Sequence, residues 1–299
     1  MSIRVSITAE RSGARHRPRW PYGLRSWRRF RRHRAATAGL LLLLALSGLA
    51  LAAPALTPED PEGQDLGRAL APASRLHPLG TDHLGRDLLA RLLYGGRLSL
   101  LIGFLAVGLG LAVGVPLGAI SGFRGGVTDL IIQRFADVLL SFPGFLLALS
   151  LVSVLGVGLQ NVVIAVGVGA IPSFIRLVRG SVLSIRQQTY VEAAAAIGQR
   201  QRTIIFCHVL PNAIAPVIVQ ATLNLGSAIL VAAGLGFLGL GVQPPTPEWG
   251  TMLGEGRQYI FRTPALTTYP GLAIFLAVLG FNLFGDGLRD ALDPRMGTR

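Results

Sequence analysis

Long stretches without a single charged residue dominate the pattern of polar and apolar positions along this chain. They cover residues 35–58, 98–123, 138–175, 203–247 and 263–285. An apolar stretch of about 18 residues or more can cross the hydrocarbon core of a bilayer as a helix. Each of the five stretches therefore predicts at least one membrane span.

Two of the stretches need closer division. The third is 38 residues long and contains Gly156, Gly158, Gln160 and Asn161, which favour a turn between two helices. The fourth has a start and a tail that suit loops better than a span, so it supplies one helix at about 213–235. The pattern predicts six spans and hence an all-α, polytopic membrane protein.

The first span has features of a cleaved signal peptide. Arg28 and Arg29 precede it, and small residues near its end, Ala52, Ala53 and Ala55, imitate a cleavage site. A cleaved signal has an apolar region of only about 7–15 residues. The uncharged stretch here is 24 residues long, which favours a helix that stays in the membrane.

The distribution of positive charge along the chain predicts how the protein is oriented in the membrane. The segments that would face the cytoplasm with an inside N-terminus carry a net charge of +14, and those outside carry −1. Residues 1–34 alone hold 11 arginines and one acid. Positive segments stay inside, so both termini are expected in the cytoplasm. Beside an apolar helix this basic arm indicates contact with anionic lipid rather than nucleic acid.

Composition excludes several activities. Only 14% of the residues are charged, against about a quarter in soluble domains. No lysine occurs, which excludes a P-loop and a Schiff base, and the single cysteine, Cys207, excludes an intrachain disulfide. The predicted spans hold no carboxylate relay of the kind that ion-coupled transporters use. We therefore expect no catalytic residue and an energy source in another chain.

The segment between the fourth and fifth spans is too long for a simple turn. Thr189 and Glu192 match a capping box, four alanines follow, and Gly198 suits a helix end. A second short helix is predicted at about 200–207, with Arg200 and Arg202 as basic neighbours. Physical chemistry alone leaves two interpretations, a docking helix for another protein or a surface connector between spans.

A resemblance to a known sequence pattern favours the interpretation as a docking helix. Glu192-Ala193-Ala194, then Gly198, then nine residues to His208 and the pair Leu210-Pro211 resemble the EAA loop of ABC-importer permeases. His208 departs from that pattern, which has isoleucine there. The resemblance implies a coupling helix that sits in a cleft of an ATPase subunit. The implied ATPase-coupling residues are Thr189, Glu192, Ala193, Ala194, Gly198, Arg200, Leu210 and Pro211.

Two further segments are similar to one subfamily, the C-type permeases of dipeptide, oligopeptide and nickel importers. They are residues 77–100, which begin His-Pro-Leu-Gly-Thr-Asp, and residues 239–250, which contain Pro-Pro-Thr-Pro. Together with Ser141-Phe142-Pro143, the likeness covers about residues 76–296. It implies a type I importer architecture in the bacterial inner membrane, with a B-type permease, two cytoplasmic ATPases that bind ATP and Mg, and an extracytoplasmic binding protein as partners.

The implied organisation has five parts. They are a basic cytoplasmic arm (1–34), a first transmembrane helix (35–56), an extracytoplasmic loop with an amphipathic helix (57–97), a permease core (98–291) with a cytoplasmic coupling loop (184–212), and a cytoplasmic tail (292–299).

Other polar residues each have two interpretations. His77, Asp82, His83 and Asp87 suggest an external metal site, but their spacing fits no zinc motif, and capping of an amphipathic helix at 86–94 is favoured. Gln220, Asn224 and Ser227 share one helix face and, with Asn282, are expected to line a path or to bond to neighbouring helices. Trp249 and Tyr259 fit a headgroup anchor or a docking surface.

Three functions from different classes therefore remain. The first is a permease subunit that moves a peptide or related solute, such as a nickel chelate. The second is a helical membrane scaffold without transport, which the spans and charges explain equally well. The third, a self-sufficient transporter or channel, is disfavoured by the missing relay.

Overall fold

The computed structural model describes residues 33–292. Within that range the chain is helical, and its only strand-like pairing is an isolated bridge between Thr81 and Asp87. The all-α prediction is confirmed. The helices are α2 (Arg34–Leu51), α3 (Ala53–Leu56), η1 (Leu66–Arg68), α4 (Leu88–Arg124), α5 (Gly126–Leu140), α6 (Gly144–Leu155), α7 (Leu159–Arg186), α8 (Thr189–Ala196), α9 (Gln201–Thr203), η2 (Ile204–Val209), α10 (Leu210–Phe237), α11 (Trp249–Gly256), η3 (Arg257–Tyr259) and α12 (Ala265–Leu292).

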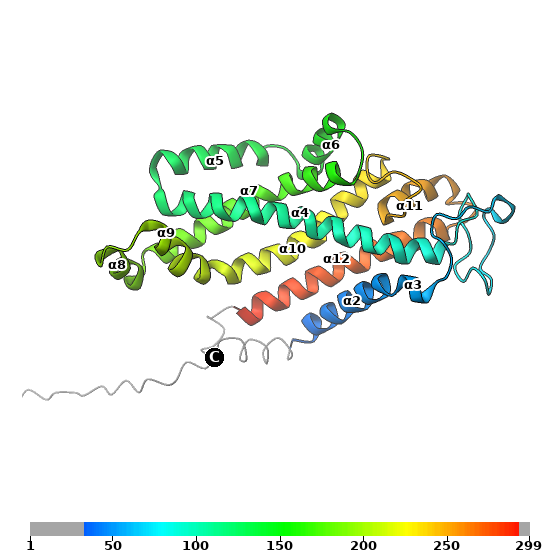
Figure 1. Ribbon diagram of the computed structural model, residues 1–299, viewed down its shortest axis with the longest axis horizontal. Coiled ribbons are helices and arrows are strands. Elements are labelled where there is room, and N and C mark those ends of the chain that lie inside the picture. The colour runs from blue at the N-terminus through cyan, green and yellow to red at the C-terminus, as the bar shows by residue number, and fades with distance from the viewer. Residues whose placement is uncertain (1–32, 293–299) are drawn as a thin grey trace, which may run out of the picture.

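The long helices α2, α4, α7, α10 and α12 run along the longest axis of the molecule (Figure 1). One end carries α8 and α9, and α12 finishes toward that end. The opposite end carries α11 and the loop between α3 and α4. We call these the α8 end and the α11 end. The basic arm falls outside the described residues, apart from its last two positions.

Five single helices are long and apolar enough to cross a membrane, and the sixth candidate is a pair, α5 and α6, bent by 88°. The span predicted in the first half of the third stretch is therefore part of a bent pair and not one continuous helix, because the chain breaks after Leu140 and resumes at Gly144. Pro143 lies in the break, and proline disfavours a helical residue before it. The predicted turn at 156–161 is confirmed, since α7 begins at Leu159 after two glycines of positive φ, Gly156 and Gly158.

Two predicted short helices turn out to be parts of longer ones. The helix expected at 86–94 is the first part of α4, which continues without a break to Arg124. Gly95 and Gly96 do not end it, because their missing side chains make room for the ring of Trp249. The helix expected at 200–207 is α9 followed by the π-helical turn η2, which continues directly into α10.

A row of glycines on α4 sets how closely α4 packs against α7. Gly110, Gly114, Gly118 and Gly122 are four residues apart and all buried. A methyl group on Gly114 would lie 2.6 Å from the Phe174 Cβ atom, and one on Gly118 would lie 2.7 Å from the Ile175 carbonyl oxygen. Small residues at such spacing let membrane helices approach closely, where packing replaces the hydrophobic effect.

The substitution Gly118→Val tests this contact. We expect it to lower the stability of the bundle by about 1–3 kcal/mol, because overpacking must separate the two helices. Gly108→Val is the matched control, since no atom outside its own helix lies within 4 Å of a side chain added there. Thermal unfolding in detergent measures both, and equal midpoints for the two variants would contradict the role of the glycine row.

Candidate functional site

The helix α8 is an exposed element anchored to the bundle by one face. Val191 and Ala194 are buried and belong to an apolar cluster with Val178, Ile204 and Val209. Its other face, including the predicted residues Thr189, Glu192 and Ala193, is exposed to solvent. The alanines have small side chains, so this face of α8 projects little, and they are strong helix formers. The arrangement is a rigid helix with a free face at one end of the molecule (Figure 1).

The C-terminal end of α8 is closed as predicted. Gly198 has φ +79°, a value that side chains rarely tolerate. Its N–H donates to the Ala195 carbonyl at 3.0 Å, and the Gln199 N–H donates to the Ala194 carbonyl at 3.2 Å. These two bonds form a Schellman motif, which satisfies carbonyls that the end of a helix would otherwise leave free.

The N-terminal end of α8 differs from the prediction. Gln188, not Thr189, is the capping residue, and no side chain makes a capping hydrogen bond there. The capping box of Thr189 and Glu192 is therefore wrong, although both side chains remain exposed. The reason is the short link from α7, which ends at Arg186 and leaves Gln188 as the last extended residue.

The π-helical turn η2 carries the chain from α8 into α10. His208, the departure from the family pattern, contacts Gln199 through its Nε2 atom at 2.9 Å, and the Asn212 side chain donates to the His208 carbonyl. Pro211 follows and has no N–H for a helical hydrogen bond, so a locally widened turn before it is physically reasonable. Arg200 and Pro211 are exposed and Leu210 is half-buried.

The polar stripe of α10 reaches a neighbouring helix. Gln220 donates to the Asn224 side chain at 3.0 Å, and Asn224 donates to the hydroxyl of Ser173 on α7 at 3.2 Å. Ser227 and Asn282 are exposed instead. The hydrogen-bonding interpretation is thus confirmed for Asn224, which bonds to a neighbouring helix, whereas the path-lining interpretation stays a prediction. The sequence gives no signal for Ser173, because its bond to Asn224 joins two helices across 51 positions of the chain.

At the α11 end, Glu248 caps α11. Its carboxylate accepts hydrogen bonds from the N–H groups of Gly250 and Thr251 and from the Ser99 hydroxyl of α4, and the residue is buried. Trp249 is only 3% exposed and donates from Nε1 to the Leu92 carbonyl. The prediction of Trp249 as a surface anchor is therefore wrong, because Gly95 and Gly96 open a place for it on α4.

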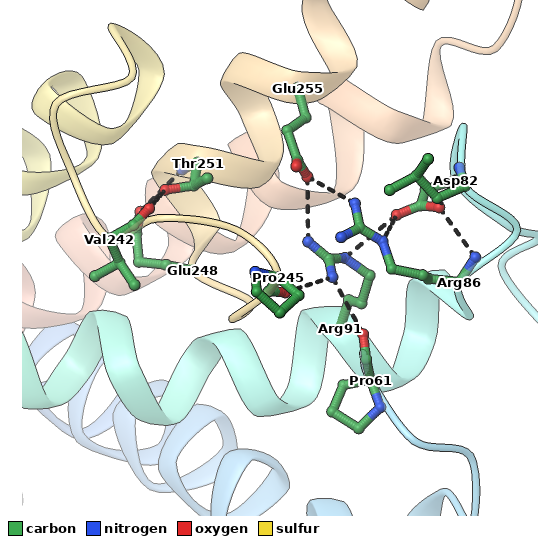
Figure 2. A network of polar contacts seen from close by, with 10 residues as sticks. Pro61, Asp82, Arg86, Arg91, Val242, Pro245, Glu248, Thr251 and Glu255 are labelled. Carbon is green, nitrogen blue, oxygen red and sulfur yellow. Dashed lines mark hydrogen bonds and ion pairs between the residues drawn. The ribbon is translucent and has the colours of Figure 1, made fainter. Parts of the chain in front are cut away.

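Two arginines and two carboxylates form a buried cluster next to this cap, shown in Figure 2. Arg86 and Arg91 both donate to the same Glu255 oxygen, at 3.0 and 3.1 Å, and Asp82 contacts both guanidinium groups. Arg91 also donates to the carbonyls of Pro61 and Pro245. The cluster ties the loop before α4 to α4 and α11.

The residues proposed as metal ligands have other partners. Asp87 caps α4 by accepting from the Ala90 N–H at 2.7 Å and contacts the His77 ring at 2.9 Å. Asp82 accepts from two backbone N–H groups as well as from arginine, and His83 stacks on Tyr259. Across residues 33–292 no three such side chains gather where a metal ion could be held. The capping interpretation is confirmed for Asp87.

Replacing Glu255 with glutamine tests the buried cluster. We expect a loss of about 3 kcal/mol in stability, because two buried guanidinium groups would lose a shared counter-charge. Asp137→Asn is the control, since Asp137 pairs with Arg176 on the exposed surface and should cost less than about 1 kcal/mol. Thermal unfolding in detergent compares them, and a larger loss from Asp137→Asn would contradict the assignment.

The bundle of apolar helices, with one exposed helix closed by glycine at its end, has the fold of a polytopic membrane protein. Solved structures share this fold. A structure of the MetNI methionine ABC transporter in an inward-facing conformation has a TM-score of 0.55 at 21% identity and covers 68% of this chain and 97% of its own. A second crystal form gives 0.53 at 23% identity and covers 68% of this chain and 96% of its own.

The chain belongs to the family of binding-protein-dependent transport system inner membrane components, whose model matches residues 114–298. Residues 22–73 match the N-terminal transmembrane domain of oligopeptide transport permease C. The whole chain is thus a multi-pass inner-membrane permease subunit of an ABC importer. Such a subunit works with ATPase and permease partners.

Curated relatives agree along nearly the whole chain. The dipeptide transport system permease protein DppC of Alkalihalophilus pseudofirmus is 46% identical, over 91% of this chain and 89% of its own. The di/tripeptide permease DppC of Pseudomonas aeruginosa is 48% identical, over 90% and 91%. The glutathione permease GsiD of Pectobacterium atrosepticum is 47% identical, over 90% of each.

Proposed function

We propose that this permease moves short peptides inward and that α8 couples it to a separate ATPase. The observation that carries the proposal is the exposed face of α8, held rigid by its Schellman motif at one end of the bundle. The peptide class rests on the relatives, which are named for dipeptides, di/tripeptides and glutathione. Membership of an importer family removes the scaffold hypothesis.

Force on α8 would reach the bundle by a short route. Val191 and Ala194 of α8 pack in one cluster with Ile204 and Val209 of η2, which continues directly into α10. The same cluster includes Val178 of α7. A displacement of α8 by closure of the ATPases would therefore move the start of α10, which carries the polar stripe, against α7.

The proposed orientation places the α8 end in the cytoplasm with both termini. Support comes from the arginine asymmetry of the sequence and from α12, which finishes toward the same end as α8 (Figure 1). The α11 end then faces the outside, where an extracytoplasmic binding protein would deliver the solute.

The proposed assembly contains this chain, a B-type permease and two ATPases. ATP and Mg would bind to the ATPases, and this chain would not be an enzyme, because it contains no lysine for a P-loop. The solute path would lie between the two permeases. Gln220, Asn224, Ser227 and Asn282 are proposed to line this chain's half, where neutral amides and hydroxyls can bond to peptide groups without binding them as charges.

Gly198→Ala tests the coupling role. The new side chain makes a positive φ cost about 1–2 kcal/mol, so the end of α8 should rearrange. We expect ATP-dependent uptake into vesicles to fall roughly tenfold, as a change of about 1.4 kcal/mol implies, with less ATPase co-purifying. The permease should still insert, which its amount in the membrane fraction measures.

Gly180→Ala is the matched control, because Gly180 lies inside α7 with nothing within 4 Å of an added methyl group. It should keep normal uptake and ATPase association. Unchanged ATPase association and uptake in both Gly198→Ala and Glu192→Ala would contradict the proposal.

Asn224→Leu tests the solute path. It removes the bond between α10 and Ser173 together with the amide groups offered to the solute, so we expect several-fold slower uptake, about 1 kcal/mol for each lost hydrogen bond, while ATPase co-purification stays normal. Thr222→Val is the control, because that hydroxyl only bonds to Ile218 of its own helix. Equal uptake in the two variants would remove Asn224 from the path.

A further inference from the structure

A cavity of about 530 Å³ opens at the α11 end, on the side of α4 where α2 and α3 lie. Its walls are the loop 58–62, the α4 turns from Tyr94 to Leu101, and the pair Thr246-Pro247. None of these belongs to α8 or to the polar stripe of α10. The cavity is thus separate from the residues assigned above to coupling and to the path.

The rim of this cavity carries carboxylates that lack a salt-bridge partner. Glu59, Asp60 and Glu62 line it, and all three are exposed. None of them forms a salt bridge with a basic side chain in the part of the chain that the structure describes. The rim therefore favours a cationic group.

Arg97 of α4 also lines the cavity, and one part of its guanidinium is free. Arg97 donates from Nε to the Ala50 carbonyl and from Nη2 to the Leu51 carbonyl, both at 2.6 Å, and lies over the Tyr94 ring. No hydrogen bond among residues 33–292 uses its Nη1 atom. Held in this way, Arg97 offers a fixed positive donor to an anionic group, and guanidinium groups bind phosphate well.

Two leucines of α4, Leu98 and Leu101, also line the cavity. From Leu101 an exposed apolar track continues along the helix. Leu101, Phe104 and Leu105 are 46%, 53% and 47% exposed and follow one another along one side of α4. Apolar side chains on a membrane-spanning helix lie at the depth of the hydrocarbon core, so this track suits an acyl chain that descends from the cavity.

We propose that this cavity binds a phospholipid with a primary-amine headgroup, as in phosphatidylethanolamine. The ammonium group would bond to the carboxylates of the rim, the phosphate to Arg97 Nη1, and one acyl chain would follow Leu101 and Leu105. An anionic glycerol headgroup meets three carboxylates without offering a cation. A quaternary choline headgroup has no N–H to donate to them.

Native mass spectrometry of the full chain in detergent tests the site. The probe is an equal mixture of phosphatidylethanolamine, phosphatidylglycerol and phosphatidylcholine with identical acyl chains. We expect retained phosphatidylethanolamine to exceed each of the others about three- to tenfold, since exposed charge pairs contribute modestly. The triple variant Glu59→Gln, Asp60→Asn, Glu62→Gln should reduce that ratio to about one.

Asp286→Asn is the control, because it removes an exposed carboxylate on α12 and should keep the preference. Leu101→Gln should lower retention of all three lipids together, which separates the acyl track from the headgroup site. Equal retention by the unsubstituted chain, or a preference that survives the triple variant, overturns the proposal. So does displacement of the bound lipid by a dipeptide, which would make the cavity a solute site.

Discussion

Inside a bilayer no water is available to the backbone, so every N–H and carbonyl must bond within the protein. This chain meets that constraint with helices alone, and their association then depends on packing rather than on a hydrophobic difference from lipid. The glycine row of α4 is the main feature that permits close packing of these helices. It lets α7 approach until the Phe174 and Ile175 backbone region fills the space of the missing side chains. Helix α10 packs against both members of this pair, and α12 packs against α10 and α2.

Polar groups are then concentrated where they do not disturb that packing. At the α11 end, Asp82, Arg86, Arg91 and Glu255 neutralise one another, and Glu248 completes the cap of α11. At the α8 end a single helix is held by two small apolar side chains and a glycine closure. The α11 end is thus stabilised by ion pairs, whereas the α8 end presents a helix that is held by apolar contacts.

The sequence predicts much of this, and the failures share a cause. Apolar stretches locate the spans because lipid imposes their length, and Gly198 is predictable because a local turn requires it. Trp249, Glu248 and the continuity of α4 through Gly95 were not predictable, since each depends on a contact between segments about 150 residues apart. The break at Pro143 was visible as a motif, but the 88° bend depends on what α5 packs against.

The π-helical turn η2 has a geometric consequence for everything that follows it. A π turn holds one residue more than an α turn, and each residue of an α-helix advances the side-chain direction by about 100°. The extra residue therefore sets the rotational phase of α10, and with it the direction in which Asn224 faces Ser173. If this one widened turn relaxed into regular helix, the whole polar stripe would rotate away from α7. The rotational orientation of the 28-residue helix α10 therefore depends on the six residues of η2 at its base.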